Sequence, residues 1–166
     1  ENGTLRPEAI AILDIIKKHD LVLATGHVSK EEALVLIETA HKKGIDRILV
    51  THALGDNPDA DFDTLKKMVA LGAKIELTYL SFLTGPQSHQ GFLQNGKHVS
   101  IAEMVTAIKT LGAQNMVLSS DLGQMGNATP YDGLLDLVVR LIQQGISTTD
   151  IEFMIKTNPR RLLGIP

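Results

Sequence analysis

The sequence predicts an α/β fold in which parallel β-strands alternate with helices. The first reason is that four short apolar runs are each bracketed by segments with helical spacing of apolar residues: 21–25, 48–51, 74–78 and 116–120. A chain of 166 residues, 43% hydrophobic and 21% charged, also fits a single globular domain over residues 1–166. Finally, three of the runs are followed by a side chain that can bind a metal ion, where parallel α/β folds collect functional groups.

Local signals place the first elements. A helix with Pro7 in its first turn precedes the strand of residues 21–25. Ser29, with Glu32 three positions later, has the pattern of a capping box and predicts the start of a second helix. Gly44 follows the apolar stripe of that helix and predicts its end.

The same alternation continues through the middle of the chain. The strand of residues 48–51 is followed by a predicted helix over residues 61–71 and by the strand of residues 74–78. Ser100 and Glu103 form a second capping-box pattern, which predicts a helix that ends before the last strand.

Two long segments interrupt the regular pattern. Residues 79–99 are rich in glycine and poor in helix formers, so they predict a long loop, and a loop of this length in a compact domain is expected to be functional. Residues 122–130 form a glycine-rich loop before a predicted helix over residues 131–143. Ser147 begins a further helix, and Asn158 begins a last short one.

Two architectures fit this order of elements. One is an open parallel sheet with helices on both faces, and the other is the last four units of an eight-stranded β/α barrel. A complete barrel needs about 250 residues. Half a barrel leaves two strand edges and an apolar interior uncovered. We therefore expect a homo-oligomer or association with a missing N-terminal half.

Composition excludes several classes of partner. The net charge is −3 and no basic stripe is present, which argues against nucleic acid. No apolar run reaches the roughly 20 residues that cross a bilayer, and no signal-peptide pattern is present, so a cytoplasmic protein is expected. Cysteine is absent, which excludes disulfides and thiolate metal sites.

The candidate site residues follow the predicted strands. His27, His52 and Asp121 are each the first strongly polar side chain after an apolar run. Two imidazoles and a carboxylate at equivalent places indicate a metal-assisted hydrolase. The alternative interpretation is that each histidine caps a helix or bonds a backbone carbonyl. Counting back by twos puts Leu23 on the face of His27 and Val50 on the face of His52.

Four further residues are weaker candidates. Glu76 lies within the third strand, where a buried carboxylate is costly unless it is paired or bound to a cation. It faces the same centre as the histidines, or it forms a salt bridge or lies on an exposed edge. His89 and His98 in the long loop line a pocket or are solvated. Gln124 lies in the glycine-rich loop, which has no P-loop pattern.

At these residues the chain resembles the C-terminal half of a metal-dependent hydrolase of the amidohydrolase superfamily. The matching segments are Thr25-Gly26-His27, Val50-Thr51-His52, Ser119-Ser120-Asp121 and the tail Thr157-Asn158-Pro159-Arg160-Arg161-Leu162-Leu163-Gly164. The resemblance implies a β/α barrel in which the four strands are the fifth to the eighth.

The resemblance also implies roles for the site residues. His27 and His52 would be metal ligands, and Asp121 would bind metal and act as the general base for a metal-bound water. The metal would be zinc, with manganese as the alternative. The superfamily's first-strand His-x-His pair and fourth-strand Lys or Glu have no counterpart here, so the implied active site is incomplete.

The sequence therefore favours a metal-dependent hydrolase that acts on a C–N or C–O bond of a small-molecule substrate. Two other interpretations remain open. One is a non-catalytic half-barrel that self-associates, and the other is an open-sheet module that binds an anion at residues 123–127.

Overall fold

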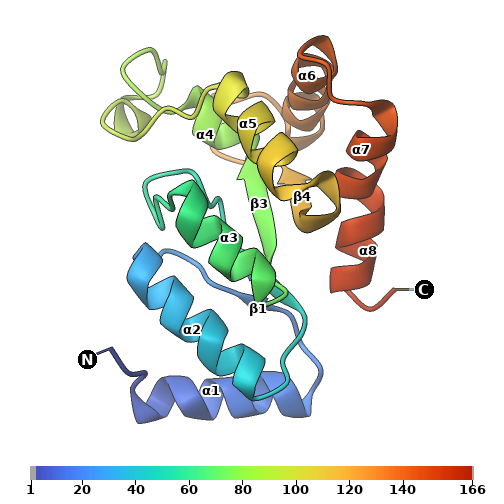
Figure 1. Ribbon diagram of the computed structural model, residues 1–166. Helices are drawn as coiled ribbons and strands as arrows, with labels where there is room; N and C mark the ends of the chain where they lie inside the picture. The colour runs from blue at the N-terminus through green and yellow to red at the C-terminus, as the bar shows by residue number, and fades with distance from the viewer. Residues whose placement is uncertain (1–2, 166) are drawn as a thin grey trace.

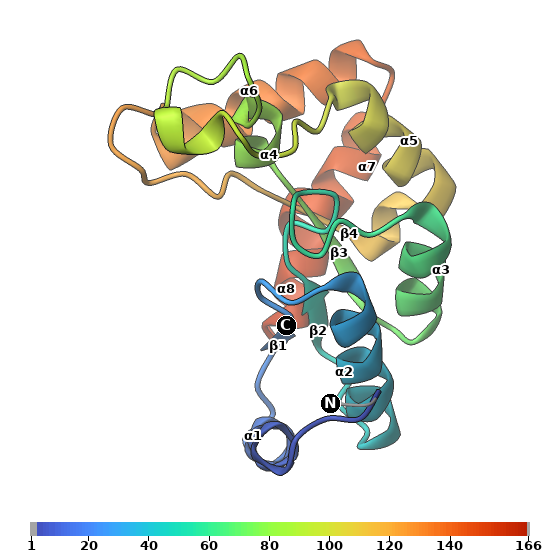
Figure 2. The ribbon, with the colours of Figure 1, turned by 90° about the vertical axis from the view of Figure 1, so that its left-hand side faces the viewer.

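The structure is a computed structural model that describes residues 3–165 (Figures 1 and 2). At its centre is a parallel sheet of four strands: β1 (Leu23–Ala24), β2 (Ile48–Val50), β3 (Lys74–Thr78) and β4 (Met116–Ser119). The strands are neighbours in the order of the chain. A doubly wound sheet would reverse its strand order at a switch point, so this order is that of consecutive barrel units.

Helices connect and flank the strands. They are α1 (Pro7–Lys18), α2 (Lys30–Lys42), α3 (Phe62–Ala70), α4 (Tyr79–Leu83), α5 (Ile101–Leu111), α6 (Pro130–Gln143), α7 (Thr148–Glu152) and α8 (Asn158–Leu162), with short 3-10 turns η1 (Gly91–Leu93) and η2 (Ala113–Asn115) and a π-helical turn η3 (Phe153–Thr157). Figure 2 shows α2, α3 and α5 together on one side of the strands. In the described part of the chain no helix is long and apolar enough to cross a membrane.

The two faces of the sheet differ in burial. Ile48, Val50 and Ile75 are fully buried and belong to the core that the helices cover. On the opposite face Leu49 and Glu76 are only half-buried. The structure thus buries one face of the sheet fully, whereas the other face is partly open: it is accessible at Leu49 and Glu76 and buried at Thr78 and Val117.

The first strand is shorter than predicted. Residues 21–25 were expected to be extended, but the ladder contains Leu23–Ala24. Asp20 adopts a positive φ of 52°, and the Leu21 N–H donates to the Ile16 carbonyl, 3.0 Å away. Leu21 therefore belongs to the C-terminal cap of α1. Its backbone N–H is used by the cap and not by the sheet, which its apolar side chain does not show.

The predicted loop over residues 79–99 contains the short helix α4 and the turn η1. Thr78 caps α4, because its hydroxyl lies 2.7 Å from the Ser81 hydroxyl and accepts from the Ser81 N–H. Five residues are too few to show helical periodicity, so the pattern could not predict this helix.

The other local predictions are confirmed. Capping boxes form at Ser29 with Glu32 and at Ser100 with Glu103. The last helix begins at Asn158 as expected, but it continues directly from α7 through the π-helical turn.

Candidate functional site

Two threonines hold the carboxyl ends of β1 and β2 together. The Thr51 N–H donates to the Thr25 hydroxyl at 3.2 Å, and the Gly26 N–H donates to the Thr51 hydroxyl at 3.1 Å. Gly26 then turns the chain with φ +65°, a conformation that glycine adopts without strain. The next residues on the two strands, His27 and His52, are brought side by side, with ring centroids 4.7 Å apart and planes tilted by 36°.

The backbone at His52 is held in an uncommon conformation. Its φ is +31°, which residues other than glycine rarely adopt. Its N–H donates to a carboxylate oxygen of Glu76 at 3.0 Å, and its carbonyl accepts from the Gly55 N–H at 2.9 Å. These bonds stabilise the turn that follows β2.

The counting rule gave the wrong face for both histidines. Leu23 and Val50 are buried in the core, whereas His27 is exposed and His52 is half-buried beside it. Alternation applies only while the backbone is extended, and the positive φ values at Gly26 and His52 end it.

Asp121 follows β4 at the same edge of the sheet. It also has a positive φ, of 53°. The Gln124 side-chain amide donates to the Asp121 carbonyl at 3.0 Å, and the Asn127 amide donates to the Gln124 side-chain carbonyl at 3.0 Å. The hydrogen bonds of Gln124 are therefore to its own loop, which they shape around Asp121.

These three candidates line one pocket of about 210 Å³. The rest of its wall comes from the loop after β2 and from the segment after β3, which contains α4 and η1. These residues are Gly55, Asp56, Asn57, Leu80, Ser81, Thr84, Phe92, Leu93, Gly96 and Lys97. None of these ten was singled out from the sequence. Their one shared signal is position, since all lie in segments that leave the carboxyl ends of β2 and β3.

Among the described residues that line this pocket, Lys97 is the one lysine or arginine, and it is already paired. Lys97 forms an ion pair with Asp59, and its backbone N–H donates to the Asp56 carboxylate at 2.9 Å. These contacts fasten the long loop over residues 79–99 to the loop after β2. The described lining residues therefore leave no uncompensated lysine to attract an anion.

His89 lies outside this pocket's lining. Its Nε2 is 2.9 Å from the Gly126 carbonyl, and the neighbouring Gln90 amide donates to the Met125 carbonyl at 2.7 Å. His89 thus connects the loop after β3 to the loop after β4. His98, also from the long loop, lies against the Phe82 ring, with centroids 5.5 Å apart.

The residues of the pocket fit a metal ion only in part. Two imidazoles at this separation can bind the same zinc ion, whose bonds to nitrogen are about 2.0–2.1 Å long. A structural or catalytic zinc site needs at least three protein ligands. Among residues 3–165 no three side chains of His, Cys, Asp or Glu gather closely enough to hold a metal ion.

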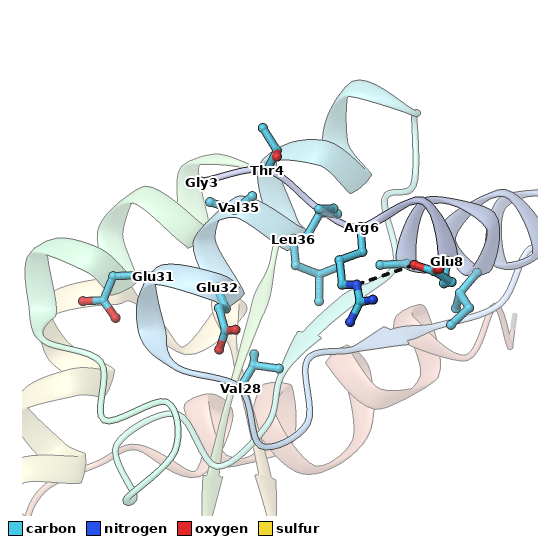
Figure 3. Close-up of a pocket in the computed structure, with 12 residues that line it drawn as sticks. Gly3, Thr4, Arg6, Glu8, Val28, Glu31, Glu32, Val35 and Leu36 are labelled. Carbon is cyan, nitrogen blue, oxygen red and sulfur yellow. Dashed lines mark ion pairs between the residues drawn. The ribbon is translucent and has the colours of Figure 1, made fainter. Parts of the chain in front are cut away.

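A larger groove lies between the N-terminal segment, α1 and α2 (Figure 3). Its volume is about 820 Å³ and its wall is mostly apolar, with Ile12, Val28 and Leu36 among the lining residues. Four charged side chains lie at it, of which Arg6 and Glu8 form an ion pair at 3.7 Å. None of the candidate catalytic residues lines this groove; they line the smaller pocket.

Comparison with known proteins bears on the fold. Residues 1–76 match a family of unknown function, DUF6282. No curated protein matches the chain. A crystal structure of an amidohydrolase from Burkholderia multivorans with bound zinc is similar, with a TM-score of 0.61 and 18% identity over 93% of this chain and 56% of that one. A second crystal structure of an amidohydrolase from that organism, with bound HEPES, gives a TM-score of 0.57 and 15% identity over the same shares.

The fold is that of about half an amidohydrolase barrel. At 18% identity the likeness establishes the arrangement of strands and helices and no more. The chain spans little more than half of the length of the amidohydrolases it matches. The zinc in that structure belongs to that protein.

Proposed function

We propose that this chain carries the C-terminal part of a metal-dependent hydrolase site of the amidohydrolase type, acting on a C–N or C–O bond of a small molecule. The observation that carries the proposal is the pair of imidazoles of His27 and His52, 4.7 Å apart in a pocket shared with Asp121. The pocket lies at the carboxyl ends of the strands, where barrel enzymes have their active sites.

The three residues have distinct roles in this proposal. His27 and His52 supply two nitrogen ligands to one divalent cation, with zinc favoured and manganese as the alternative. Such a cation makes bound water acidic enough to deprotonate near neutral pH. The Asp121 carboxylate, exposed at the pocket, accepts a proton from the attacking water.

The rest of the ligand set comes from a partner molecule or segment in this proposal. A partner that closes the barrel, either an N-terminal half or a second copy of the chain, would bring further ligands to the same edge of the sheet. The partly open face of the sheet and the exposed side chains of Ile12 and Ile15, 58% and 55% accessible, support such a partner. They also suit the alternative of a half-barrel scaffold that self-associates without a metal.

Two measurements test the proposal: isothermal titration calorimetry of the protein with zinc, and elemental analysis of the dialysed protein. We expect the wild-type chain to bind zinc and His52→Ala to bind it more than about tenfold less tightly, because loss of even an outer partner of a ligand costs about 10–100-fold. His41→Ala is the matched control, since His41 is an exposed histidine of α2 away from the pocket. Equal zinc binding by wild type and His52→Ala, or none by either, would contradict the proposal.

A further inference from the structure

We infer that Glu76 is the positioning residue of this site: its carboxylate fixes the turn that carries His52 and the end of the strand that leads to Asp121. This inference rests on the proposed function for its catalytic meaning. Its structural content rests on contacts that need no metal.

Glu76 connects three strands at their carboxyl ends. One carboxylate oxygen accepts from the His52 N–H at 3.0 Å, just after β2. The other accepts from the Ser119 hydroxyl at 2.9 Å, at the end of β4. The backbone carbonyl of Glu76 also accepts from the Ala53 N–H at 3.0 Å. One side chain of β3 therefore bonds to both neighbouring strands.

The chemistry of these partners calls for a carboxylate. The His52 N–H can only donate, the Ser119 hydroxyl donates here, and an ionised carboxylate accepts at both of its oxygens and adds its charge to both bonds. A glutamine side chain has the same shape but one oxygen and one NH₂ group. In Glu76→Gln the amide oxygen can still accept from the His52 N–H, but the Ser119 hydroxyl has to accept from the NH₂ group, and both bonds lose the charge of the carboxylate.

The location of the two bonds gives them a role beyond general stability. His52 has a φ of +31°, and a charge-assisted hydrogen bond to its N–H opposes the cost of that conformation. Ser119 is two residues before Asp121, whose φ is also positive. The same carboxylate thus holds the backbone at His52 and the end of the strand just before Asp121, two of the three proposed site residues.

The sequence already marked Glu76 as a mid-strand carboxylate that needs a partner or a cation. Its bonds to His52 and Ser119 satisfy that need within the protein. Glu76 is only half-buried, on the partly open face of the sheet. We therefore assign it to positioning and do not count it among the metal ligands.

The test compares Glu76→Gln with Glu31→Gln, an exposed glutamate on α2 that controls for the loss of one negative charge. Histidine imidazole and backbone amide signals are recorded by NMR in metal-free protein. Zinc affinity is measured on the same samples. We expect Glu76→Gln to shift the His52 signals, to leave those of His41 unchanged and to weaken zinc binding about tenfold, while Glu31→Gln changes none of them.

Unchanged His52 signals in a folded Glu76→Gln protein would overturn the inference, whether or not zinc binds. Absence of zinc binding by the wild type, together with shifted His52 signals, would contradict the proposed function and leave the positioning intact. If Glu76→Gln does not fold, Ser119→Ala is the second variant. It removes one of the two bonds, and we expect it to shift the Asp121 amide signal; an unchanged Asp121 signal would overturn the inference.

Discussion

At the scale of single residues, Asn158 is a polar side chain that the fold buries outside the pocket. It is fully buried, and its amide donates to the carbonyls of Ala113 and Met116 at 2.9 and 2.7 Å. These bonds attach α8 to the start of β4. The Asn-Pro in the tail therefore has a structural explanation in this chain: the asparagine donates to two backbone carbonyls at the start of β4.

Replacement of this asparagine should be costly. Asn158→Ala removes both bonds and leaves two buried carbonyls without these donors, so we expect a loss of about 2–3 kcal/mol in the free energy of unfolding. Urea denaturation followed by circular dichroism measures this loss. Asn95→Ala, at an exposed position of the long loop, is the control. A loss within about 0.5 kcal/mol of the control would mean that the two bonds contribute little.

The sequence could predict which residues follow the strands but not how their side chains point. His27, His52 and Asp121 share one pocket because parallel strands end at one edge. Their orientation depends on positive φ values at Gly26, His52 and Asp121. Only at the glycine could a positive φ be predicted from the sequence. At a histidine or an aspartate a positive φ depends on tertiary hydrogen bonds, such as that from the His52 N–H to Glu76.

At the scale of elements, α3 begins at a carboxylate that has two partners. The Asp61 side chain accepts from the Thr64 N–H at 2.9 Å and pairs with Lys30 at 3.0 Å. The hydrogen bond from the Thr64 backbone, followed by that from Lys30, holds the pKa of Asp61 well below its usual range. The lowered pKa means that the ionised carboxylate stabilises the folded state.

This contribution has a defined pH dependence. Because the folded-state pKa is lowered, the contribution is fully present above the ordinary aspartate pKa of about 3.9 and is lost as pH falls toward the folded-state pKa. Asp61→Asn keeps a capping side chain but loses the charge. We expect the variant to be less stable than wild type at pH 6 and the difference to shrink below about pH 4. Urea midpoints across pH 2–7 measure this, and a difference independent of pH would refute the assignment.

Helices with capping boxes were predicted well, whereas the short helix α4 was not. Ser29 and Ser100 each find their partner three residues later, so the signal lies within four residues. The start of α4 is instead fixed by Thr78 at the end of a buried strand, and the limits of β1 by the cap of α1. Where two neighbouring elements compete for the same residues, tertiary packing decides the boundary. A short stretch of sequence does not show that packing.

At the scale of the whole molecule, two apolar helix faces remain exposed. On α6 the exposed residues recur at helical spacing: Tyr131, Leu135, Val139 and Ile142, with accessibilities of 74%, 48%, 42% and 41%. On α1, Ile12 and Ile15 are more than half exposed. Together with a partly open sheet face these surfaces suit a molecule that binds a further half.

We therefore expect the wild-type chain to self-associate with increasing concentration. The double variant Ile12→Glu/Ile15→Glu should reduce this association, because it places charge on the exposed face of α1. Size-exclusion chromatography with light scattering measures the mass. Lys18→Glu is the matched control, since it makes the net charge more negative by the same amount at an exposed position of α1. A wild-type mass that stays monomeric at all concentrations would contradict the expectation.

The order of the strands has a consequence for how the chain acquires its structure. β1 pairs with β2, β2 with β3 and β3 with β4, so each strand finds its partner in the segment made just before it. Each of the four described strands pairs with its neighbour in sequence, so the chain segments that must be closed into loops are limited to one β/α unit. During synthesis on the ribosome, each β/α unit can therefore dock as it emerges, and β4 completes the sheet last.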